Sequence, residues 1–342
     1  MQNAPPLHAE GLLHRALMTL GGIAQPFDAI SCLDDLHAAA AAGDAPAARA
    51  LGMAWAHAGD ADAARTCFSV ALSRGDALSA FLLARVTGDA SCSAALDAFA
   101  AANGIARAKA FLPTPAPTSA QAPIVAPTSL PPPPAGSVLD VAPLDAVVHH
   151  AQPPIATFED VLSPLDCEYV IGMASGRVQR SLVHDPHGGG PMLHPMRTSH
   201  SMTFPAIDDD FWLRQLQRRL AALTGLPFAH AEPLAVLRYA RGEEYRPHRD
   251  YLRDPAALGP AAPGQRVRTV FAYLSDVAAG GETDFPLLGV RIAPRRGRVV
   301  MFDNVKPDGS PDADTLHAGL PVGQGRKWLA TLWMRERPVR DA

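Results

Sequence analysis

The sequence contains few cysteines. Four are present, Cys32, Cys67, Cys92 and Cys167, and no two of them form a CxxC pair. A disulfide framework and a cysteine-type zinc site both need cysteines in closer or more regular spacing. We therefore exclude both and expect all four to be reduced, buried side chains.

Long apolar runs and broad basic surfaces are also absent. The formal net charge is -4 and the basic clusters are short, so neither nucleic acid nor an anionic membrane is an expected partner. No stretch of about 18 uncharged apolar residues occurs, and the first residues lack the basic start and apolar run of a secretory signal. We expect a soluble cytoplasmic protein.

What the sequence does have is length and helix-forming residues. Its 342 residues are 48% hydrophobic, enough for two separate cores. Ala and Leu at helical spacing dominate residues 29–112, interrupted by Gly-Asp pairs. A glycine in the left-handed conformation ends a helix, and the following Asp caps the next one. The pairs are Gly43-Asp44, Gly59-Asp60, Gly75-Asp76 and Gly88-Asp89. This pattern predicts an α-helical region within residues 1–112.

The helical region also shows a weak internal repeat. Gly43-Asp44 recurs 32 residues later at Gly75-Asp76, and Ala48 and Leu51 map onto Ala80 and Leu83. Such a period is typical of stacked helix–turn–helix units. The stretch resembles tetratricopeptide and Sel1-like repeats, whose usual role is to bind a protein partner. An ordinary helical bundle is an equally good interpretation of so Ala-rich a segment.

A proline-rich segment follows. Residues 113–136, PTPAPTSAQAPIVAPTSLPPPPAG, cannot form a helix or a central strand, because proline lacks the backbone donor. We interpret this segment as a semi-extended linker and the remainder, residues 137–342, as a second domain with its core at about 156–337. Whether the two parts pack together is left open.

The second domain mixes helices with short strands. Apolar residues at helical spacing mark 164–175 and 208–224, the latter opening with acidic residues suited to a helix N-terminus. From Leu234 onward the runs LAVLRY, VRTVFAYL, GVRIA, GRVVMF and KWLATLWM alternate with turns. Several short strands at this spacing favour an antiparallel sandwich or barrel.

The most informative segment is LAVLRYARGEEYRPHRDYL. In a strand, His248 and Asp250 would point to the same face. The best third ligand is His317, just before the last strand. Two histidines and one carboxylate leave three positions open on an octahedral ion, which suits non-heme iron(II) with a chelating 2-oxo acid and O₂. A structural zinc site would be closed by protein atoms, and an H-x-D alone arises often by chance.

Lys327 supports the functional interpretation. It comes ten residues after His317, inside the apolar strand KWLATLWM, where a lysine would normally lie on the surface. Alternation places Lys327, Leu329, Thr331 and Trp333 on one face. If that face is the inner one, the ammonium needs an anion, because an unpaired buried charge is costly. The distal carboxylate of 2-oxoglutarate fits this need.

These motifs together carry a family resemblance. From about 156 to 337 the chain resembles the catalytic domain of the prolyl 4-hydroxylase family of 2-oxoglutarate oxygenases. The match covers LRYARGEEYRPHRDYL, RVRTVFAYLSDVAAGGETDFP, RIAPRRGRVVMFDN and LHAGLPVGQGRKWLATLWMRER. The family pattern is complete at His248, Asp250, His317 and Lys327, and the retained Asp250 argues against a halogenase or an inactive relative.

The resemblance implies a fold and a reaction. It implies an α+β multidomain chain whose C-terminal part is a double-stranded β-helix, or jelly roll, with flanking helices. It also implies Fe(II) as cofactor, 2-oxoglutarate and O₂ as co-substrates, ascorbate as reductant, and hydroxylation of an unactivated C–H bond.

Further site residues are also implied by the resemblance. Tyr239 and Thr283, with Tyr273 in addition, match positions near 2-oxoglutarate; buried hydroxyls that bond to backbone are the alternative. Three others, Tyr245, Arg266 and Trp333, match positions that line the peptide groove in relatives acting on prolyl chains, where flat aromatics suit a proline ring. Ordinary packing is the alternative.

Other polar clusters are less informative. His184, His187, His194 and His200 lie in a Gly- and Pro-rich segment, which favours a loop that closes over substrate rather than a zinc site. Gly280-Gly281 is expected to form a turn, since no helix follows to bind a phosphate. His149 and His150, beside the linker, are expected to be solvated.

Three functions remain in competition. The first is a peptidyl or protein hydroxylase, plausibly prolyl. The second keeps the chemistry but acts on a free amino acid or another small molecule. The third is a helical-repeat scaffold that carries an inactive jelly roll.

Overall fold

The computed structural model describes residues 8–20, 27–112, 129–141, 144–184, 191–205, 208–254, 259 and 262–340. Most of the predicted linker therefore lies outside the described residues, and its last part, 129–135, carries neither helix nor strand. No helix in the described part of the chain is long and apolar enough to cross a membrane.

The N-terminal third is helical. Its helices are α1 (Ala9–Leu20), α2 (Ala29–Ala41), α3 (Ala45–His57), α4 (Ala61–Ser73), α5 (Ala77–Val86) and α6 (Ala90–Ala102), followed by the 3-10 helices η1 (Ala106–Phe111) and η2 (Gly136–Leu139). Asp44, Asp60, Asp76 and Asp89 each accept a backbone N–H at the start of a helix. The glycine before each Asp has a positive φ. The Gly-Asp prediction is confirmed at all four positions.

The 32-residue period corresponds to pairs of helices. Gly43-Asp44 precedes α3 and Gly75-Asp76 precedes α5, and α3 packs on α4 as α5 packs on α6. The equivalent residues Ala48 and Ala80, and Leu51 and Leu83, are all buried. The helices are therefore stacked as the period predicts, while the type of repeat stays a prediction.

The C-terminal part contains two main antiparallel sheets. The major sheet has the order β1-β2-β13-β9-β16-β7-β6-β3 and the minor sheet the order β12-β11-β14-β8. The strands of the major sheet are β1 (Val147–Ala151), β2 (Pro154–Phe158), β13 (Val299–Asp303), β9 (Arg266–Tyr273), β16 (Lys327–Arg335), β7 (Ala235–Tyr239), β6 (His200–Thr203) and β3 (Gln179–Arg180). Those of the minor sheet are β12 (Val290–Ile292), β11 (Thr283–Phe285), β14 (His317–Gly319) and β8 (Tyr245–His248).

Short elements complete the domain. Two-stranded pairs are formed by β10 (Ala279–Gly280) with β15 (Val322–Gln324) and by β4 (Val183–His184) with β5 (Pro191–Met192). The helices are α7 (Pro164–Ala174), α8 (Phe211–Leu223), η4 (Phe228–His230) and η6 (Ala313–Thr315). The five predicted strands and both predicted helices are confirmed, and one of these strands, GVRIA, is β12 of the minor sheet. The hairpin β1–β2 and the minor-sheet strands β11 and β14 were not predicted individually.

Alternation along the major sheet separates two apolar cores. Side chains on its inner face, such as Tyr239, Phe271 and Leu329, pack with Phe285 and Ile292 of the minor sheet. Side chains on its outer face belong to a second cluster that extends through α7 and α8 into the N-terminal helices, and these include Val236, Ala272, Ala330 and Leu332. Two cores exist as expected, but the sheet, not the linker, divides them.

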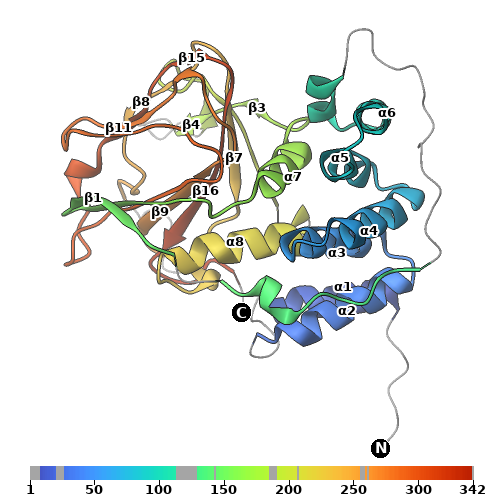
Figure 1. The fold of residues 1–342 in the computed structure, drawn as a ribbon. Helices are drawn as coiled ribbons and strands as arrows, with labels where there is room; N and C mark the ends of the chain where they lie inside the picture. The colour runs from blue at the N-terminus through green and yellow to red at the C-terminus, as the bar shows by residue number, and fades with distance from the viewer. Residues whose placement is uncertain are drawn as a thin grey trace, which may run out of the picture.

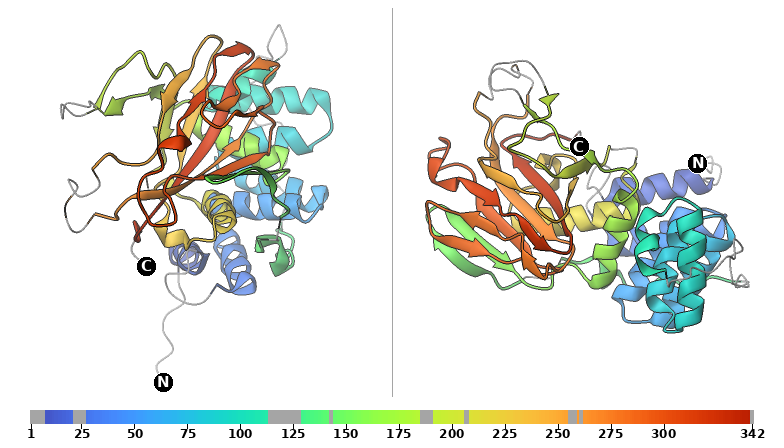
Figure 2. Two further views of the ribbon diagram at one scale, coloured as in Figure 1. Left: turned by 90° about the vertical axis from the view of Figure 1, so that its left-hand side faces the viewer. Right: turned by 90° about the horizontal axis from the view of Figure 1, so that it is seen from above.

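The molecule is therefore layered. The sheets lie on one side, α7 and α8 cover the outer face of the major sheet, and α1–α6 pack on the far side of those two helices (Figures 1 and 2). The close approach of α7 to α5 depends on Gly172, where an added Cβ would lie 2.9 Å from Leu78 Cδ1. The helical region is docked onto the C-terminal domain, so the two parts of the chain pack together, a point that the sequence left open.

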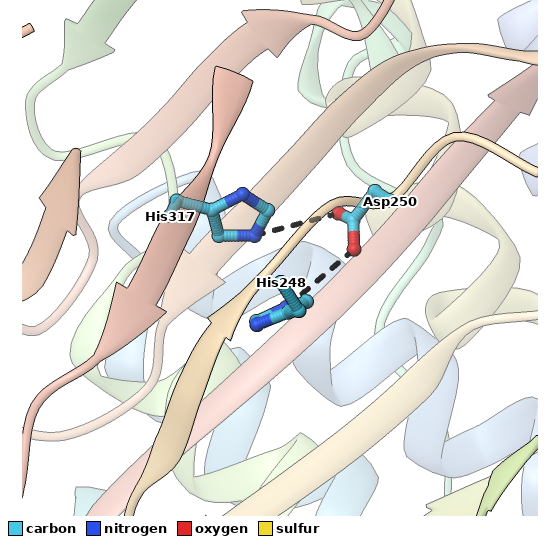
Figure 3. A group of neighbouring side chains, drawn as sticks. All are labelled: His248, Asp250 and His317. Carbon is cyan, nitrogen blue, oxygen red and sulfur yellow. Dashed lines mark ion pairs between the residues drawn. The ribbon is translucent and has the colours of Figure 1, made fainter. Parts of the chain in front are cut away.

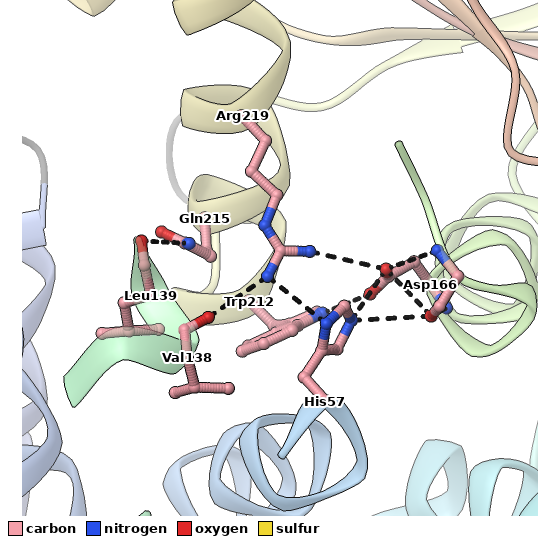
Figure 4. Close-up of polar contacts among 8 residues, drawn as sticks. His57, Val138, Leu139, Asp166, Trp212, Gln215 and Arg219 are labelled. Carbon is pink, nitrogen blue, oxygen red and sulfur yellow. Dashed lines mark hydrogen bonds and ion pairs between the residues drawn. The ribbon is translucent and has the colours of Figure 1, made fainter. Parts of the chain in front are cut away.

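A buried polar network fixes this docking (Figure 4). His57 of α3 lies 2.8 Å from the Asp166 carboxylate of α7, and Trp212 of α8 donates its indole N–H to the same carboxylate at 2.8 Å. Arg219 lies 3.6 Å from Asp166 and donates to the carbonyl of Val138. Burial alone would raise the Asp166 pKa, but the hydrogen bonds and charges of His57, Arg219 and Trp212 lower it to about 2. One carboxylate thus joins three helices.

The cysteine expectation is confirmed in part. All four cysteines are free; Cys32, Cys67 and Cys167 are buried, but Cys92 is only half-buried near the start of α6. His149 is exposed on β1, with a hydrogen bond to Thr157, and His150 bonds to the carbonyl of Pro153.

Candidate metal centre and co-substrate site

Two neighbouring strands of the minor sheet bring the candidate ligands together. His317 of β14 is paired directly with His248 of β8, and the ligand atoms of His248, Asp250 and His317 all lie within 4.8 Å of one another. The three side chains point toward a common point (Figure 3). In the described part of the chain they form the one group that could hold a metal ion.

One detail of the sequence argument is corrected. Strand β8 ends at His248, so Asp250 lies beyond the strand and not at its next inward position. Its carboxylate is nevertheless turned inward, 3.7 Å from His248 Nε2 and 3.9 Å from His317 Nε2. Arg249 points away and donates to the carbonyl of Ala313 at 2.8 Å. The bend after the strand, and not strand alternation, therefore directs the Asp250 carboxylate toward the two histidines.

Backbone carbonyls orient both imidazoles. His248 Nδ1 lies 2.9 Å from the carbonyl of Arg246, and His317 Nδ1 lies 2.9 Å from that of Thr315. A ring nitrogen beside a carbonyl must carry its proton, which leaves the lone pair of each Nε2 free. This outer hydrogen bond is the usual support of a metal-bound histidine. The donor set therefore fits a divalent metal.

The electrostatics favour the ligand protonation states. Burial, assisted by the neighbouring His317, lowers the His248 pKa, so the imidazole is neutral. Burial would raise the Asp250 pKa, but His317, His248 and Arg266 outweigh it and keep the carboxylate charged. Neutral imidazoles and an ionised carboxylate are the forms that bind metal.

A second set of residues holds Asp250. Thr269 of β9 donates to Asp250 Oδ2 at 2.8 Å, and the Asn304 amide donates to the Thr269 hydroxyl at 2.9 Å. Both side chains are buried. Sequence reasoning did not find them. Thr269 shares the inner face of its strand with Phe271 and Tyr273, and a polar residue on such a buried face indicates a role in the site.

Aromatic rings enclose the centre. Tyr245 stacks on His248 with ring centroids 3.4 Å apart, and Phe285 and Phe302 lie against His317. These rings exclude water from one side of the metal position, where bulk solvent would weaken electrostatic interactions.

Lys327 lies on the inner face, as predicted. It is 1% exposed, and among the described residues it has no ion pair. Its ammonium lies over the rings of Tyr239 and Tyr273, at 5.2 and 5.5 Å from their centroids. Burial lowers its pKa from 10.5 to about 7, opposed in part by Glu282. A buried lysine without an ion pair is a binding site for an anion, because a negative charge would stabilise its ammonium.

The spacing between Lys327 and the metal ligands suits a short dicarboxylate. A Cβ added to Gly319 would lie 3.6 Å from Lys327 Nζ, and Gly319 follows His317 by two residues on β14. Two residues of a strand span about 7 Å. A five-carbon diacid can therefore meet the metal with one end and Lys327 with the other, and Gly319 leaves the space between them open.

The remaining predicted residues lie around this space. Thr283 is buried and shares a 2.7 Å hydrogen bond with the Tyr273 hydroxyl. Tyr239 is buried beside Lys327, and burial raises its pKa to about 12. The two tyrosines and Thr283 thus keep neutral hydroxyls near Lys327. Gly280 and Gly281 both have positive φ, but Gly280 ends strand β10 and Gly281 lies in the connection to β11, where a turn was expected. A Cβ on Gly281 would lie 3.4 Å from Lys327 Cδ.

The predicted peptide-groove residues form one cluster beside Asp250. Arg266 donates to both oxygens of Glu232 at 2.7 and 2.8 Å and lies 4.1 Å above the Trp333 ring. Tyr245 is covered on its other side by Arg197, 4.9 Å from its ring.

The histidine cluster is not brought together in the described residues. His194 accepts a hydrogen bond from the backbone N–H of Met196, and His200 lies 3.3 Å from Glu243. His187 and most of the predicted lid, residues 185–190, lie outside the described residues.

Comparison with known proteins identifies the family. Residues 234–335 match the model of the 2OG-Fe(II) oxygenase superfamily. Prolyl 4-hydroxylase 1 of Arabidopsis thaliana is 35% identical over 199 residues, which cover 54% of this chain and 70% of that protein. The chain belongs to the prolyl 4-hydroxylase family of 2-oxoglutarate- and iron(II)-dependent oxygenases.

Two further prolyl hydroxylases show the extent of the similarity. A probable prolyl 4-hydroxylase 7 of A. thaliana is 34% identical over 208 residues, 56% of this chain and 65% of that protein. The chain thus spans slightly less than two thirds of that relative. The crystal structure of the viral collagen prolyl hydroxylase of Paramecium Bursaria Chlorella virus-1 with 2OG covers 53% of this chain and 95% of that one, at 27% identity and a TM-score of 0.41.

Proposed function

We propose that the protein is an Fe(II)- and 2-oxoglutarate-dependent dioxygenase that hydroxylates a peptide or protein side chain, with proline as the residue. Two features carry this proposal: His248, Asp250 and His317 surround one point, and the buried Lys327 lies beside Gly319, two residues along β14 from His317. Membership of the prolyl 4-hydroxylase family supports it.

One set of residues would bind the metal and the co-substrate, and another set orients the metal ligands. His248, Asp250 and His317 would hold Fe(II), and Lys327, with Tyr239 and Thr283 nearby, would bind the distal carboxylate of 2-oxoglutarate. When bound, Fe(II) and 2-oxoglutarate use O₂ to hydroxylate a C–H bond, giving succinate and CO₂. Thr269 and Asn304 hold Asp250, and Phe285 and Phe302 exclude water from His317. Ascorbate is the proposed reductant.

The cluster beside Asp250 supports a peptide substrate. Trp333 provides a flat surface next to the metal ligands, the kind of contact that suits a proline ring. Tyr245, whose ring faces are covered by His248 and Arg197, would contact the peptide through its ring edge and hydroxyl. Because Glu232 already satisfies the Arg266 guanidinium, we propose that Arg266 acts by fixing the Trp333 ring. The relatives named above are prolyl hydroxylases, which favours proline over other residues.

The experiment is turnover on a panel of proline-containing peptides and free metabolites. The full chain with Fe(II), 2-oxoglutarate and ascorbate should produce succinate together with a +16 product on a peptide, read by mass spectrometry. A +16 product on a free metabolite alone would favour the small-molecule hydroxylase. No succinate with any substrate would contradict the proposal.

Two variants distinguish an enzyme from an inactive scaffold. His248→Ala should lose iron binding, and Lys327→Ala should lose 2-oxoglutarate binding. His149→Ala and Lys306→Ala are matched controls, because both residues are exposed on the surface. If the site variants bound both ligands as the controls do, the jelly roll would be a scaffold. Binding of a protein partner by the N-terminal helices, and a cytoplasmic location, stay predictions.

A further inference from the structure

A basic cavity lies outside the metal and co-substrate site, at the junction of the helical layer and the C-terminal domain. Its volume is about 430 Å³, within the range of small-ligand pockets, and eight residues line it. They are Ala106, Arg107, Lys109, Ala110, Ser175, Arg238, Arg326 and Trp328. These residues come from η1, the end of α7, β7 and the start of β16; α7 lies between β7 and the α5–α6 pair (Figure 1).

The cavity has an excess of positive charge. Among the described residues, four cationic side chains line it and no carboxylate does. Arg107 is neutralised by Glu168, with hydrogen bonds of 2.9 and 2.8 Å. Lys109, Arg238 and Arg326 have no ion pair with any described residue. Lys109 and Arg326 are exposed and can be hydrated, whereas Arg238 is half-buried. The protein has a net negative charge, so the excess of positive charge around this cavity is not a consequence of composition.

Arg238 gives an independent indication of a missing acceptor. Its Nε is buried and has no hydrogen-bond partner among the described residues. A buried donor without an acceptor costs free energy, the more so on a charged group. The predicted linker follows η1 in the sequence, and its residues 113–136 contain no Asp or Glu. That segment of the chain therefore cannot supply the negative charge.

We propose that this cavity binds a small, multiply charged oxyanion, such as a phosphate-bearing or polycarboxylate metabolite. Two arginines provide planar donor forks that suit an oxyanion, and Lys109 adds a mobile charge. The Ser175 hydroxyl already accepts the backbone N–H of Arg107 at 2.9 Å, which fixes this wall of the cavity.

The proposed anion site and the 2-oxoglutarate site lie on opposite faces of the same strands. Trp328 pairs with Arg238 across β16 and β7, and the next pair is Lys327 with Tyr239. Alternation directs the first pair to the outer face and the second to the inner face. The two anions can therefore be bound at once, and the proposal does not depend on the hydroxylase function.

Anion binding to the full chain tests the proposal. Inorganic pyrophosphate and citrate are titrated by calorimetry in the presence of saturating 2-oxoglutarate, and again in Lys327→Met, so that the inner site cannot account for the signal. At least one of the two should bind with one-to-one stoichiometry in both settings. Tighter binding of pyrophosphate would indicate a phosphate-bearing ligand, and tighter binding of citrate would indicate a polycarboxylate.

Matched variants locate the binding. Arg238→Gln and Arg326→Gln should each weaken the affinity by at least about tenfold, the expected loss of one charge-assisted hydrogen bond. Arg291→Gln, an exposed arginine on the minor sheet, should leave it unchanged. Without anion, both cavity variants should melt no lower than the parent, because they relieve repulsion between like charges.

Three results would overturn the proposal. One is no binding of either anion. Another is binding that survives both cavity variants, which would place it elsewhere. The third is binding of an acidic peptide without binding of pyrophosphate or citrate, which would make the cavity part of a protein interface. Since Arg326 is exposed, Arg326→Gln remains informative even if Arg238→Gln fails to fold.

Discussion

The two faces of β16 differ in what they bury. The inner face carries Lys327 and Thr331, both buried; the Lys327 ammonium lies over the rings of Tyr239 and Tyr273 and lacks an ion pair in the described structure. The outer face carries Trp328, Ala330, Leu332 and Met334, all in one apolar cluster with α8 and the helical layer. The inner side chains of this strand thus line the site, and the outer side chains contribute to the stability of the fold.

This comparison teaches that residues for function and residues for stability alternate along the strand, so the two can be changed separately. Inner-face polar groups impose a desolvation cost that only a ligand can offset. Outer-face groups fill space and dock the helices. Substitutions of these inner-face polar groups should therefore change binding and turnover with little loss of stability, and substitutions on the outer side should do the reverse.

The largest expected effect is on the inner side. His317→Ala should abolish iron binding and turnover, because two remaining ligands cannot hold the metal against water. Its unfolding midpoint should fall modestly, since the imidazole packs on Phe285 and Phe302 and makes one hydrogen bond, to the Thr315 carbonyl. Iron content and succinate formation are the measurements, with His149→Ala as control. Retained iron in His317→Ala would show that another residue completes the centre.

The largest effect on the outer side is expected for Asp166→Ala. It leaves His57, Trp212 and Arg219 without their shared acceptor, and breaking such a buried pair costs about 3–5 kcal/mol. Urea unfolding measures the loss, with the exposed Asp62→Ala as control. The turnover number of the folded fraction should match the parent. A lower turnover number at unchanged stability would contradict the separation of the two faces.

The same carboxylate should make stability depend on acid pH. The Asp166 pKa is about 2 in the folded protein against an ordinary value of 3.8. A lowered pKa stabilises the fold above the unfolded value, so this contribution is present above about pH 4 and is lost as the pH falls toward 2. Its size is about 2 kcal/mol, and it should be missing from the Asp166→Ala unfolding profile.

Lys327→Met should have opposite effects on binding and stability. Loss of the ammonium should weaken 2-oxoglutarate binding by about 100-fold, while removal of an uncompensated buried charge should raise the free energy of unfolding by about 2 kcal/mol. Calorimetry and urea unfolding measure the two, with Lys306→Met as a surface control. A destabilised variant would mean that Lys327 supports the fold, and our interpretation of the inner face would be wrong.

The affinity for 2-oxoglutarate should fall at alkaline pH. Burial holds the Lys327 pKa at about 7 in the free protein, and a bound carboxylate raises it. Between the two pKa values binding takes up a proton, so affinity is flat below about pH 7 and falls above it by up to about tenfold per pH unit. Lys327→Arg, which stays charged, should remove the slope. Equal slopes in both proteins would assign it to another group.

The helical half of the fold could be predicted in unusual detail. Each Gly-Asp pair encodes a local event, a left-handed helix end followed by a capping carboxylate, and all four occur. The docking could not be predicted, because it depends on distant partners such as His57 and Asp166 that no local pattern connects. Of the minor-sheet strands, β8 and β12 were predicted, whereas β11 and β14 were missed because their three residues contain no apolar or β-branched run.

The site was predictable where chemistry restricts the residue type. His248, His317 and Lys327 were found because a strand position and a ligand requirement coincide. Asp250 was found for a reason that was partly wrong, since a turn and not the strand directs it inward. Thr269 and Asn304 were missed because a threonine or asparagine is common in any strand or turn, and only the hydrogen bonds distinguish them.

The smallest expected effect tests how tightly the helical layer is packed. In Gly172→Ala the new Cβ would lie 2.9 Å from Leu78 Cδ1 and 3.3 Å from Phe81 Cδ1. The Leu78 methyl is the end of a flexible side chain, so it can move, and the better helix propensity of alanine offsets part of the strain. We expect a net loss of about 1 kcal/mol by urea unfolding, with no change in the 2-oxoglutarate affinity. A change in that affinity would show that the outer face is coupled to the inner one through the sheet, and would end the separation from which these predictions start.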